Sequence, residues 1–153
     1  MAEKKNATEV VLDFSGVKPF EPMDPDLVYL CQVSNLTLGT SKAAGKPKVS
    51  AELTVKGPEE VEVVELDGTR PGRNTRAAGR KLFREYSLEE KALPFLHEFI
   101  KAADPEADLG EDFRFNPQNY MGLEVAVKIQ NEEYQEQIRP RVGRVLPASA
   151  YKG

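Results

Sequence analysis

Apolar and polar residues alternate with a period of two along five segments of this chain. Successive side chains of a β-strand point to opposite faces of its sheet, so this alternation predicts half-buried strands. It is clear in the first, second and fourth segments and weaker in the other two. The segments are residues 27–33, 49–55, 81–87, 123–129 and 138–146. Pro140 places the last one at a sheet edge or a bulge, because proline has no N–H for the ladder.

One helix is predicted between the third and fourth of these segments. Apolar residues recur at helical spacing over residues 93–103. Ser87 and Glu90 have the spacing of a capping box, which marks a helix start. Pro94 conflicts with an uninterrupted helix, so either the first turn is separate and Pro94 opens the main helix, or the helix kinks there. Asp104 and the proline after it are expected to end the helix.

Two further segments extend or interrupt this pattern. Residues 1–25 are rich in proline and polar residues, and they predict an extended N-terminal arm with a short strand at Val10 to Phe14. Residues 57–78 separate the second strand from the third. They contain a strand-like piece, VEVVEL, and most of the basic stretch TRPGRNTRAAGR at residues 69–80. The proline, glycines and asparagine of that stretch predict a loop and not a helix.

The predicted order is three strands, a helix and two strands. We therefore expect a mainly β protein: a five-stranded OB-fold-like antiparallel barrel with one helix between strands 3 and 4, an extended N-terminal arm, and a long loop between strands 2 and 3. An open five-stranded sheet with one covering helix is the alternative. The domain is expected to cover residues 26–147, with 57–78 as an insertion and 148–153 as a short C-terminal tail.

Composition limits the class of protein. The chain has 153 residues, 40% of them hydrophobic and 30% charged, which is typical of one soluble globular domain. No apolar run approaches the ~20 residues that span a membrane, so no membrane partner is expected. The N-terminus lacks the apolar region of a secretory signal. The single cysteine, Cys31, cannot form an internal disulfide, which favours a reducing compartment.

The residues offer little chemistry for catalysis. His97 is the only histidine, and helical spacing places it on the surface. Cys31 lies on an apolar strand face, which favours an inert core position. No His or Cys cluster has metal-ligand spacing, and GTRPGR lacks the Gly-Lys-Ser/Thr end of a phosphate-binding loop. We therefore predict a protein that is not an enzyme and that has no cofactor or metal.

Basic residues cluster although the net charge is -4. Binding a nucleic acid single strand requires cations for the phosphates and aromatic faces for the bases. The candidate nucleic-acid-binding residues are Lys42, Lys46, Lys48, Arg70, Arg73, Arg76, Arg80, Lys81, Arg84, Tyr86, Tyr134, Arg139 and Arg141. In the competing interpretation the lysines only face solvent and Tyr134 packs against its hairpin. Tyr29 and Phe99 are expected in the core, and for Phe83 a core position is favoured over a stacking position.

Three stretches resemble a known family when they are taken in order: residues 36–55, residues 79–103 and residues 122–147. They carry a Ser-Lys-x-x-Gly-x-Pro turn, a Gly-Arg pair before the third strand, and a Glu-Tyr turn before the last strand. Over residues 27–147 the chain resembles phage-encoded proteins similar to single-stranded DNA-binding proteins. The resemblance implies an OB fold that binds single-stranded DNA without sequence preference during phage replication and recombination, in the cytoplasm of the bacterial host.

A second function remains open beside the first. The acidic net charge, the N-terminal arm and the insertion at residues 57–78 also fit a virion structural protein, such as a capsid decoration or minor head protein, that reuses the same fold. In that case the arm and the loop at residues 69–78 would contact further copies or other phage proteins. The arginine loop is thus predicted to touch either DNA or a protein neighbour.

Overall fold

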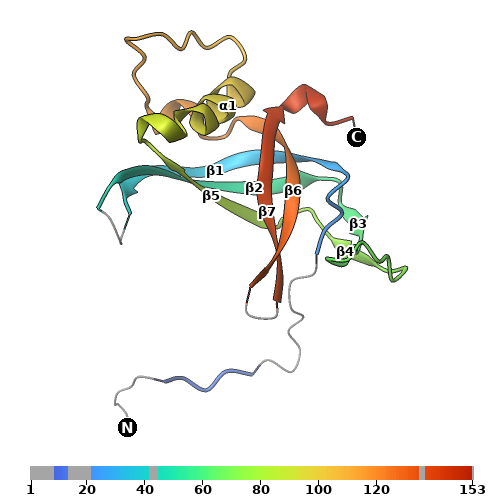
Figure 1. Cartoon of the computed structure of the whole chain (residues 1–153). Helices are drawn as coiled ribbons and strands as arrows, with labels where there is room; N and C mark the ends of the chain where they lie inside the picture. The colour runs from blue at the N-terminus through green and yellow to red at the C-terminus, as the bar shows by residue number, and fades with distance from the viewer. Residues whose placement is uncertain (1–8, 14–21, 42–44, 135–136, 153) are drawn as a thin grey trace.

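A five-stranded antiparallel sheet organises the protein (Figure 1). The computed structural model describes residues 9–13, 22–41, 45–134 and 137–152, without the side chains of residues 134–139. The strand order is β5-β2-β1-β6-β7. The strands are β1 (Val28–Thr40), β2 (Pro47–Gly57), β5 (Lys81–Ser87), β6 (Glu124–Tyr134) and β7 (Gln137–Pro147). All five predicted strands are therefore confirmed, and β1 and β6 extend furthest beyond their predicted ends.

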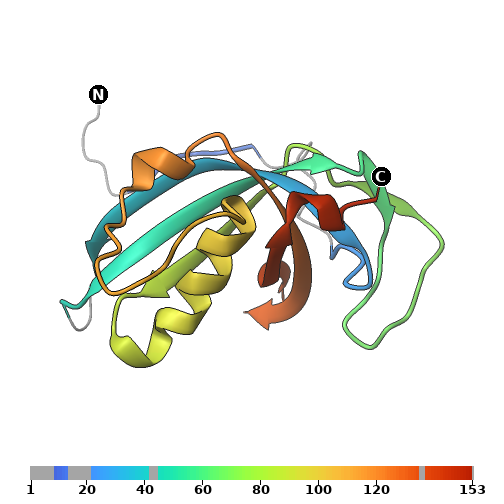
Figure 2. The same ribbon diagram turned by 90° about the horizontal axis from the view of Figure 1, so that it is seen from above.

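The sheet is not closed into a barrel by a hydrogen-bonded ladder in the described part of the chain. β5 and β7 are its two edge strands, and a side chain connects them: Arg84 Nη1 donates to Val142 O at 3.1 Å and to Gly143 O at 3.3 Å. Figure 2 shows α1 (Leu93–Ala103) packed where these two edges approach each other. Glu98 of this helix accepts from Val145 N at 3.1 Å. The open sheet with one covering helix is thus the accurate description, and Pro140 lies on an edge strand as predicted.

The helix begins after a separate first turn. The 3-10 turn η2 (Glu90–Ala92) precedes α1, and Pro94 lies in the first turn of α1, where its missing N–H costs no hydrogen bond. Ser87 Oγ accepts from Glu89 N at 3.1 Å. Ser87 is therefore the N-cap of neither η2 nor α1, neither of which has a side-chain cap, and the predicted capping box with Glu90 is wrong. The helix ends before Asp104, as expected.

The core lies between the inner face of the sheet and α1. Tyr29, Cys31 and Phe99 are fully buried, which confirms the three core predictions. Tyr29 Oη donates to Asp24 O at 2.8 Å, so its buried hydroxyl has a partner. Phe83 is 60% exposed, so its favoured placement in the core was wrong. The exposure of Phe83 follows from strand alternation, because the even-numbered residues Leu82 and Tyr86 of β5 point inward.

The insertion forms a small second sheet. β3 (Glu60–Glu62) pairs with β4 (Asn74–Arg76) in antiparallel register. The strand-like piece at residues 61–66 is therefore a strand only at its start, and the predicted loop at residues 69–78 contains a strand. Gly72 has a φ of 83° in the connection, a backbone conformation that favours glycine.

The two ends of the chain differ in structure. The predicted strand at the start is wrong for residues 9–13, which have no regular secondary structure and pair with no strand; Phe14 lies outside the described residues. At the other end, the turn η4 (Ala148–Ala150) brings Tyr151 against β2, because a Cβ added at Gly57 would lie 2.6 Å from Tyr151 Oη. η3 (Pro117–Tyr120) leads into β6. No helix in the described residues has the length and apolar character needed to cross a bilayer.

Burial predicts an unreactive cysteine. Removal from water raises the pKa of the Cys31 thiol to about 12, because the thiolate is the charged form. In the native protein at pH 8, we expect a thiol reagent such as DTNB to label Cys31 at least about a hundredfold more slowly than in the urea-unfolded chain. Comparable rates in the two states would contradict a buried Cys31.

The bridge between the edge strands predicts a stability effect. Arg84→Met keeps most of the side-chain volume but removes the donor from two β7 carbonyls, so we expect the free energy of unfolding to fall by about 1–3 kcal/mol. Urea denaturation would measure the change, with Arg114→Met at an exposed arginine outside the sheet as the control. If both variants are as stable as the wild type, the guanidinium does not hold the two edges together.

Candidate nucleic-acid interface

The side chains of strand β5 alternate between the buried core and the exposed outer face of the sheet. Leu82 and Tyr86 are buried, with 3% of each exposed. Lys81, Phe83 and Glu85 alternate with them and are exposed. Because successive side chains of a strand point to opposite faces, these three lie on the outer face of the sheet. β5 thus presents an aromatic ring between a cation and an anion.

The adjacent strand β2 completes this arrangement. Glu52 lies directly opposite Phe83 in the β2–β5 register. Lys81 Nζ lies 3.5 Å from Glu52 Oε2, and Lys48 of β2 forms an ion pair with Glu85. Phe83 is therefore placed between two ion pairs that cross from strand to strand. We call these residues, Lys48, Glu52, Lys81, Phe83 and Glu85, the Phe83 face.

Electrostatics keeps the carboxylate of Glu85 ionised. The hydrogen bond from Lys48 lowers the pKa of Glu85 most, and desolvation by burial raises it. The charge of Lys48, a hydrogen bond with Ser50 and the charge of Arg141 lower it further. Glu52 has other partners, because Ser34 Oγ donates to its Oε2 at 2.8 Å. Each carboxylate of the Phe83 face is thus held by at least one donor.

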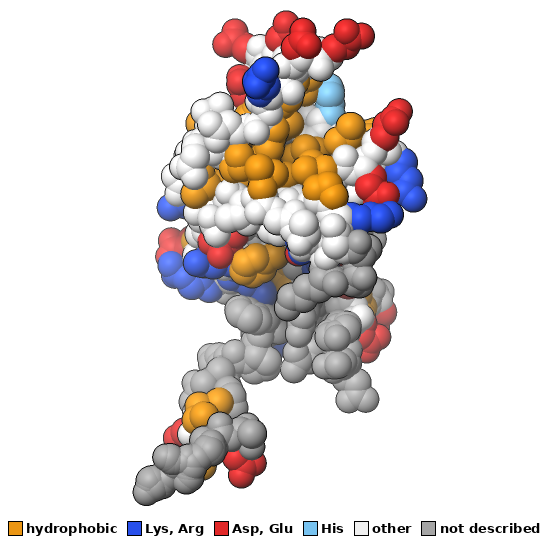
Figure 3. All heavy atoms as spheres, turned by 90° about the vertical axis from the view of Figure 1, so that its left-hand side faces the viewer, with side chains coloured by type: hydrophobic (Ala, Val, Ile, Leu, Met, Phe, Trp, Pro, Cys, Tyr) orange, Lys and Arg blue, Asp and Glu red, His pale blue; other side chains and the backbone are white. Residues whose placement is uncertain are grey.

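Two further ion pairs involve predicted cations outside the Phe83 face, namely Lys46, which directly precedes β2, and Arg141 of β7. Lys46 Nζ lies 3.0 Å from Glu89 Oε1, and this contact lowers the pKa of Glu89. Arg141 Nη1 lies 3.5 Å from Glu132 Oε1 on the neighbouring strand β6. Both pairs are largely exposed. On the side of the molecule shown in Figure 3, acidic side chains gather at one end, and basic and hydrophobic side chains lie further down.

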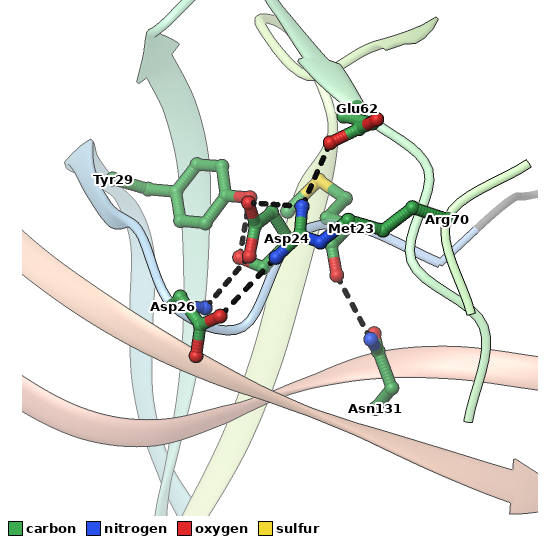
Figure 4. A network of polar contacts seen from close by, with 7 residues as sticks. All are labelled: Met23, Asp24, Asp26, Tyr29, Glu62, Arg70 and Asn131. Atoms are coloured by element: carbon green, nitrogen blue, oxygen red, sulfur yellow. Dashed lines mark hydrogen bonds and ion pairs between the residues drawn. The ribbon is translucent and has the colours of Figure 1, made fainter. Parts of the chain in front are cut away.

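Arg70 has a structural position and does not lie with these cations. Its Nη1 lies 2.8 Å from Glu62 Oε1 and 3.2 Å from Asp24 Oδ2, and its Nη2 lies 3.2 Å from Asp26 Oδ2. Figure 4 shows the guanidinium directed at these carboxylates. The hydrogen bonds to Glu62 and then Asp24 raise the pKa of Arg70. Arg70 thus joins the insertion to the segment that precedes β1.

The base of the N-terminal arm is fixed at the same place. Met23 is fully buried, and Asn131 Nδ2 of β6 donates to Met23 O at 2.8 Å (Figure 4). The side chain of Asp24 is only 10% exposed. A carboxylate this buried needs compensation by charge or hydrogen bonds, and Arg70 supplies both.

The other arginines of the basic stretch also lie apart from the Phe83 face. Arg76 donates through Nε to Ala78 O at 3.0 Å, and its Nη1 lies 3.5 Å from Glu59 Oε1. Arg80 is half-buried, and desolvation lowers its pKa. Arg73 is exposed. The stretch is therefore not one uniform basic surface.

The structure corrects the predicted nucleic-acid-binding roles of Tyr86 and Arg84. Tyr86 packs on Phe99 with ring centroids 5.5 Å apart, and burial raises its pKa to about 12. Its other neighbour is Arg84, whose guanidinium carbon lies 5.1 Å from the Tyr86 ring centroid. Tyr86 therefore has no open face for a base, and Arg84 is engaged with β7.

Three predicted residues cannot be placed by their side chains. Lys42 lies outside the described residues, as do the side chains of Tyr134 and Arg139. The backbone of Tyr134 ends β6, and Arg139 lies opposite Glu132 in the β6–β7 register. Among the described residues, no group of His, Cys, Asp or Glu side chains could hold a metal ion.

Sequence reasoning missed the glutamates and misplaced Phe83. The signal for Phe83 was present, because Leu82 and Tyr86 of KLFREYS are in phase with each other and out of phase with Phe83. The ion-pair partners had no such signal, since Lys48 and Glu85 are far apart along the chain and meet only through the β2–β5 register.

The Arg70 contacts predict a stability role that is separate from binding. Arg70→Ala would leave the largely buried carboxylate of Asp24 without its cation, so we expect the free energy of unfolding to fall, as measured by urea denaturation. Arg70→Lys should recover only part of this loss, because one ammonium cannot replace the planar fork of the guanidinium. Full stability in Arg70→Ala would contradict the structural role.

Neither the protein-family models nor the curated proteins contain a match to this chain. The candidate interface is therefore defined by its own geometry. Its distinguishing feature is one exposed aromatic ring between two interstrand ion pairs.

Proposed function

We propose that the protein binds single-stranded DNA, without sequence preference, across the outer face of β2 and β5. The observation that carries this proposal is the exposed ring of Phe83, flanked on its own strand by Lys81 and across the sheet by the Lys48–Glu85 pair. Single strands are bound by aromatic rings that stack on bases and by cations that follow the phosphates. Every base has a π-face, so such a surface is tolerant of sequence.

We further propose that the fold is a partly open OB fold. In chain order the strands of the main sheet are β1, β2, β5, β6 and β7, with α1 between the third and the fourth. The OB fold is a five-stranded, partly open barrel that binds oligonucleotides on its second and third strands. β2 and β5 occupy these positions, and the Arg84 contacts bring β5 and β7 together where a barrel would close.

The connections beside the Phe83 face extend the proposed path of the strand. In OB folds the loops between strands 1 and 2 and between strands 4 and 5 grip the ligand. Lys46 lies at the end of the first such connection and is exposed, and Arg141 follows the second. Lys42, Tyr134 and Arg139 belong to the same two regions, and their contribution to binding is part of the proposal.

The biological setting follows from the resemblance. Proteins that bind single strands without sequence preference protect them during copying and strand exchange. We therefore propose a role in phage replication or recombination, in the cytoplasm of the bacterial host.

A virion structural role is the second candidate. The observation in its favour is the arm segment Val10–Leu12, where Val11 is 100% exposed and the flanking residues are 73% and 63% exposed. Exposed apolar segments of this kind mark contact with another protein. Mass spectrometry of purified particles would favour this role if the protein is present at shell stoichiometry. Expression only early in infection, with none in particles, would exclude it.

Phe83 allows the DNA-binding proposal to be tested. Fluorescence anisotropy with a dye-labelled oligo-dT at low salt should show binding by the wild type, and Phe83→Ala should weaken it about tenfold, since base–aromatic stacking contributes ~1–3 kcal/mol per base. Phe83→Tyr should bind nearly as well as the wild type, and Phe83→Leu should bind weakly because it keeps apolar area without a stacking face.

The salt dependence provides an independent check. The logarithm of the binding constant should fall linearly with the logarithm of salt concentration, with a slope of about -0.7 per neutralised phosphate. Leu66→Ala, an exposed apolar residue of the insertion, serves as the control and should leave affinity unchanged. No binding of oligo-dT at low salt would overturn the proposed function.

A further inference from the structure

The cations of the candidate interface already have anionic partners. Lys48 pairs with Glu85, Lys81 with Glu52 and Lys46 with Glu89. A phosphodiester bound beside the exposed ring of Phe83 would approach the ammonium groups of Lys48 and Lys81, and one that continues toward the start of β2 would approach Lys46. The glutamates and an incoming phosphate would therefore compete for the same donors.

The glutamate–phosphate competition would take place on the Phe83 face. On β5, Phe83 and Glu85 project on the same side, two residues apart, and Lys48 reaches Glu85 from β2. Glu85 is 62% exposed at its side chain, whereas the Lys48 side chain is 20% exposed. A phosphate next to the Phe83 ring would thus meet a carboxylate on the surface before it meets the ammonium.

Displacing the glutamates is feasible because surface ion pairs are weak, and the carboxylates of both pairs reach solvent, with 62% of the Glu85 side chain and 37% of the Glu89 side chain exposed. Such pairs contribute little stability in water, since solvent screens the charges and both side chains lose freedom. A carboxylate that is displaced from Lys48 remains solvated at the surface. The loss of each pair therefore reduces affinity without preventing binding.

We propose that Glu85 and Glu89 act as built-in competitors of the DNA phosphates, and so limit the affinity of the Phe83 face for single-stranded DNA. This inference rests on the proposed function. The ligand group for which these glutamates compete is the phosphodiester backbone. The residues that limit its binding are acidic and not basic. A moderate affinity suits a protein that must leave the strand when other proteins act on it.

The consequence is a gain of function when an acid is neutralised. Glu85→Gln keeps the size of the side chain and removes its charge, so affinity for oligo-dT at low salt should rise about three- to tenfold. Glu89→Gln should produce a smaller rise, because Lys46 precedes the first residue of β2 and lies further from Phe83 than Lys48 does. Glu111→Gln, in the segment between α1 and η3, makes the same change in net charge away from the two strands and should change affinity less than about 1.5-fold, given a screening length of about 10 Å.

A double-mutant cycle separates competition from general repulsion. In the Lys48→Gln background there is no ammonium to release, so Glu85→Gln should lose most of its gain. Anisotropy titrations of the wild type, the two single variants and the double variant would measure the coupling. Circular dichroism would confirm that each variant remains folded.

The possible outcomes distinguish the two proposals. A rise in Glu85→Gln that disappears in the Lys48→Gln background supports competition. An unchanged affinity in Glu85→Gln, with clear binding by the wild type, overturns the inference and leaves the proposed function standing. An equal rise in both backgrounds also overturns it, because the effect would then be general charge repulsion. No binding by any variant would remove the proposed function itself.

Discussion

The contact that holds the two edges of the sheet together is made by a side chain and not by a ladder. Arg84 reaches from β5 to two carbonyls of β7, and Glu98 of α1 accepts the N–H of Val145 on the same strand. A guanidinium is suited to this role because it stays charged and carries five donors in a rigid plane. These contacts also cover an edge that would otherwise be open to pairing with another chain.

Local patterns were enough to predict the five strands of the main sheet and the helix α1. Period two identifies strands such as β2 and β5 because side-chain direction in a strand depends only on sequence parity. The helix was equally accessible, and of the two alternatives at Pro94, a separate first turn or a kink, the structure has the separate first turn, since a proline is tolerated at the start of a helix. The failed strand at residues 10–14 shows the limit of such patterns. A strand needs a partner, and Val10–Leu12 has none among the described residues.

Charge clusters were a poor guide to the interface, because they ignore pairing in space. Arg70 was grouped with its sequence neighbours, yet its ion-pair partners include Asp24 and Asp26. These two residues precede β1 in the sequence, whereas Arg70 follows β2. Lys48 likewise meets Glu85 only through strand register. A run of arginines in the sequence forms a basic surface only if no carboxylates lie close to these arginines in the folded protein. Here the acidic and basic segments of an overall acidic chain meet one another.

The side-chain contact between the sheet edges and the candidate interface both depend on the register of β5. Arg84 must lie on the side of β5 that faces β7, next to buried Tyr86. Parity then forces Phe83 and Glu85 to the outer face, where they meet the side chains of β2. A shift of β5 by one residue would bury the charge of Glu85 and expose Tyr86. The same register that joins the edges therefore also decides which ring and which acid a single strand would meet.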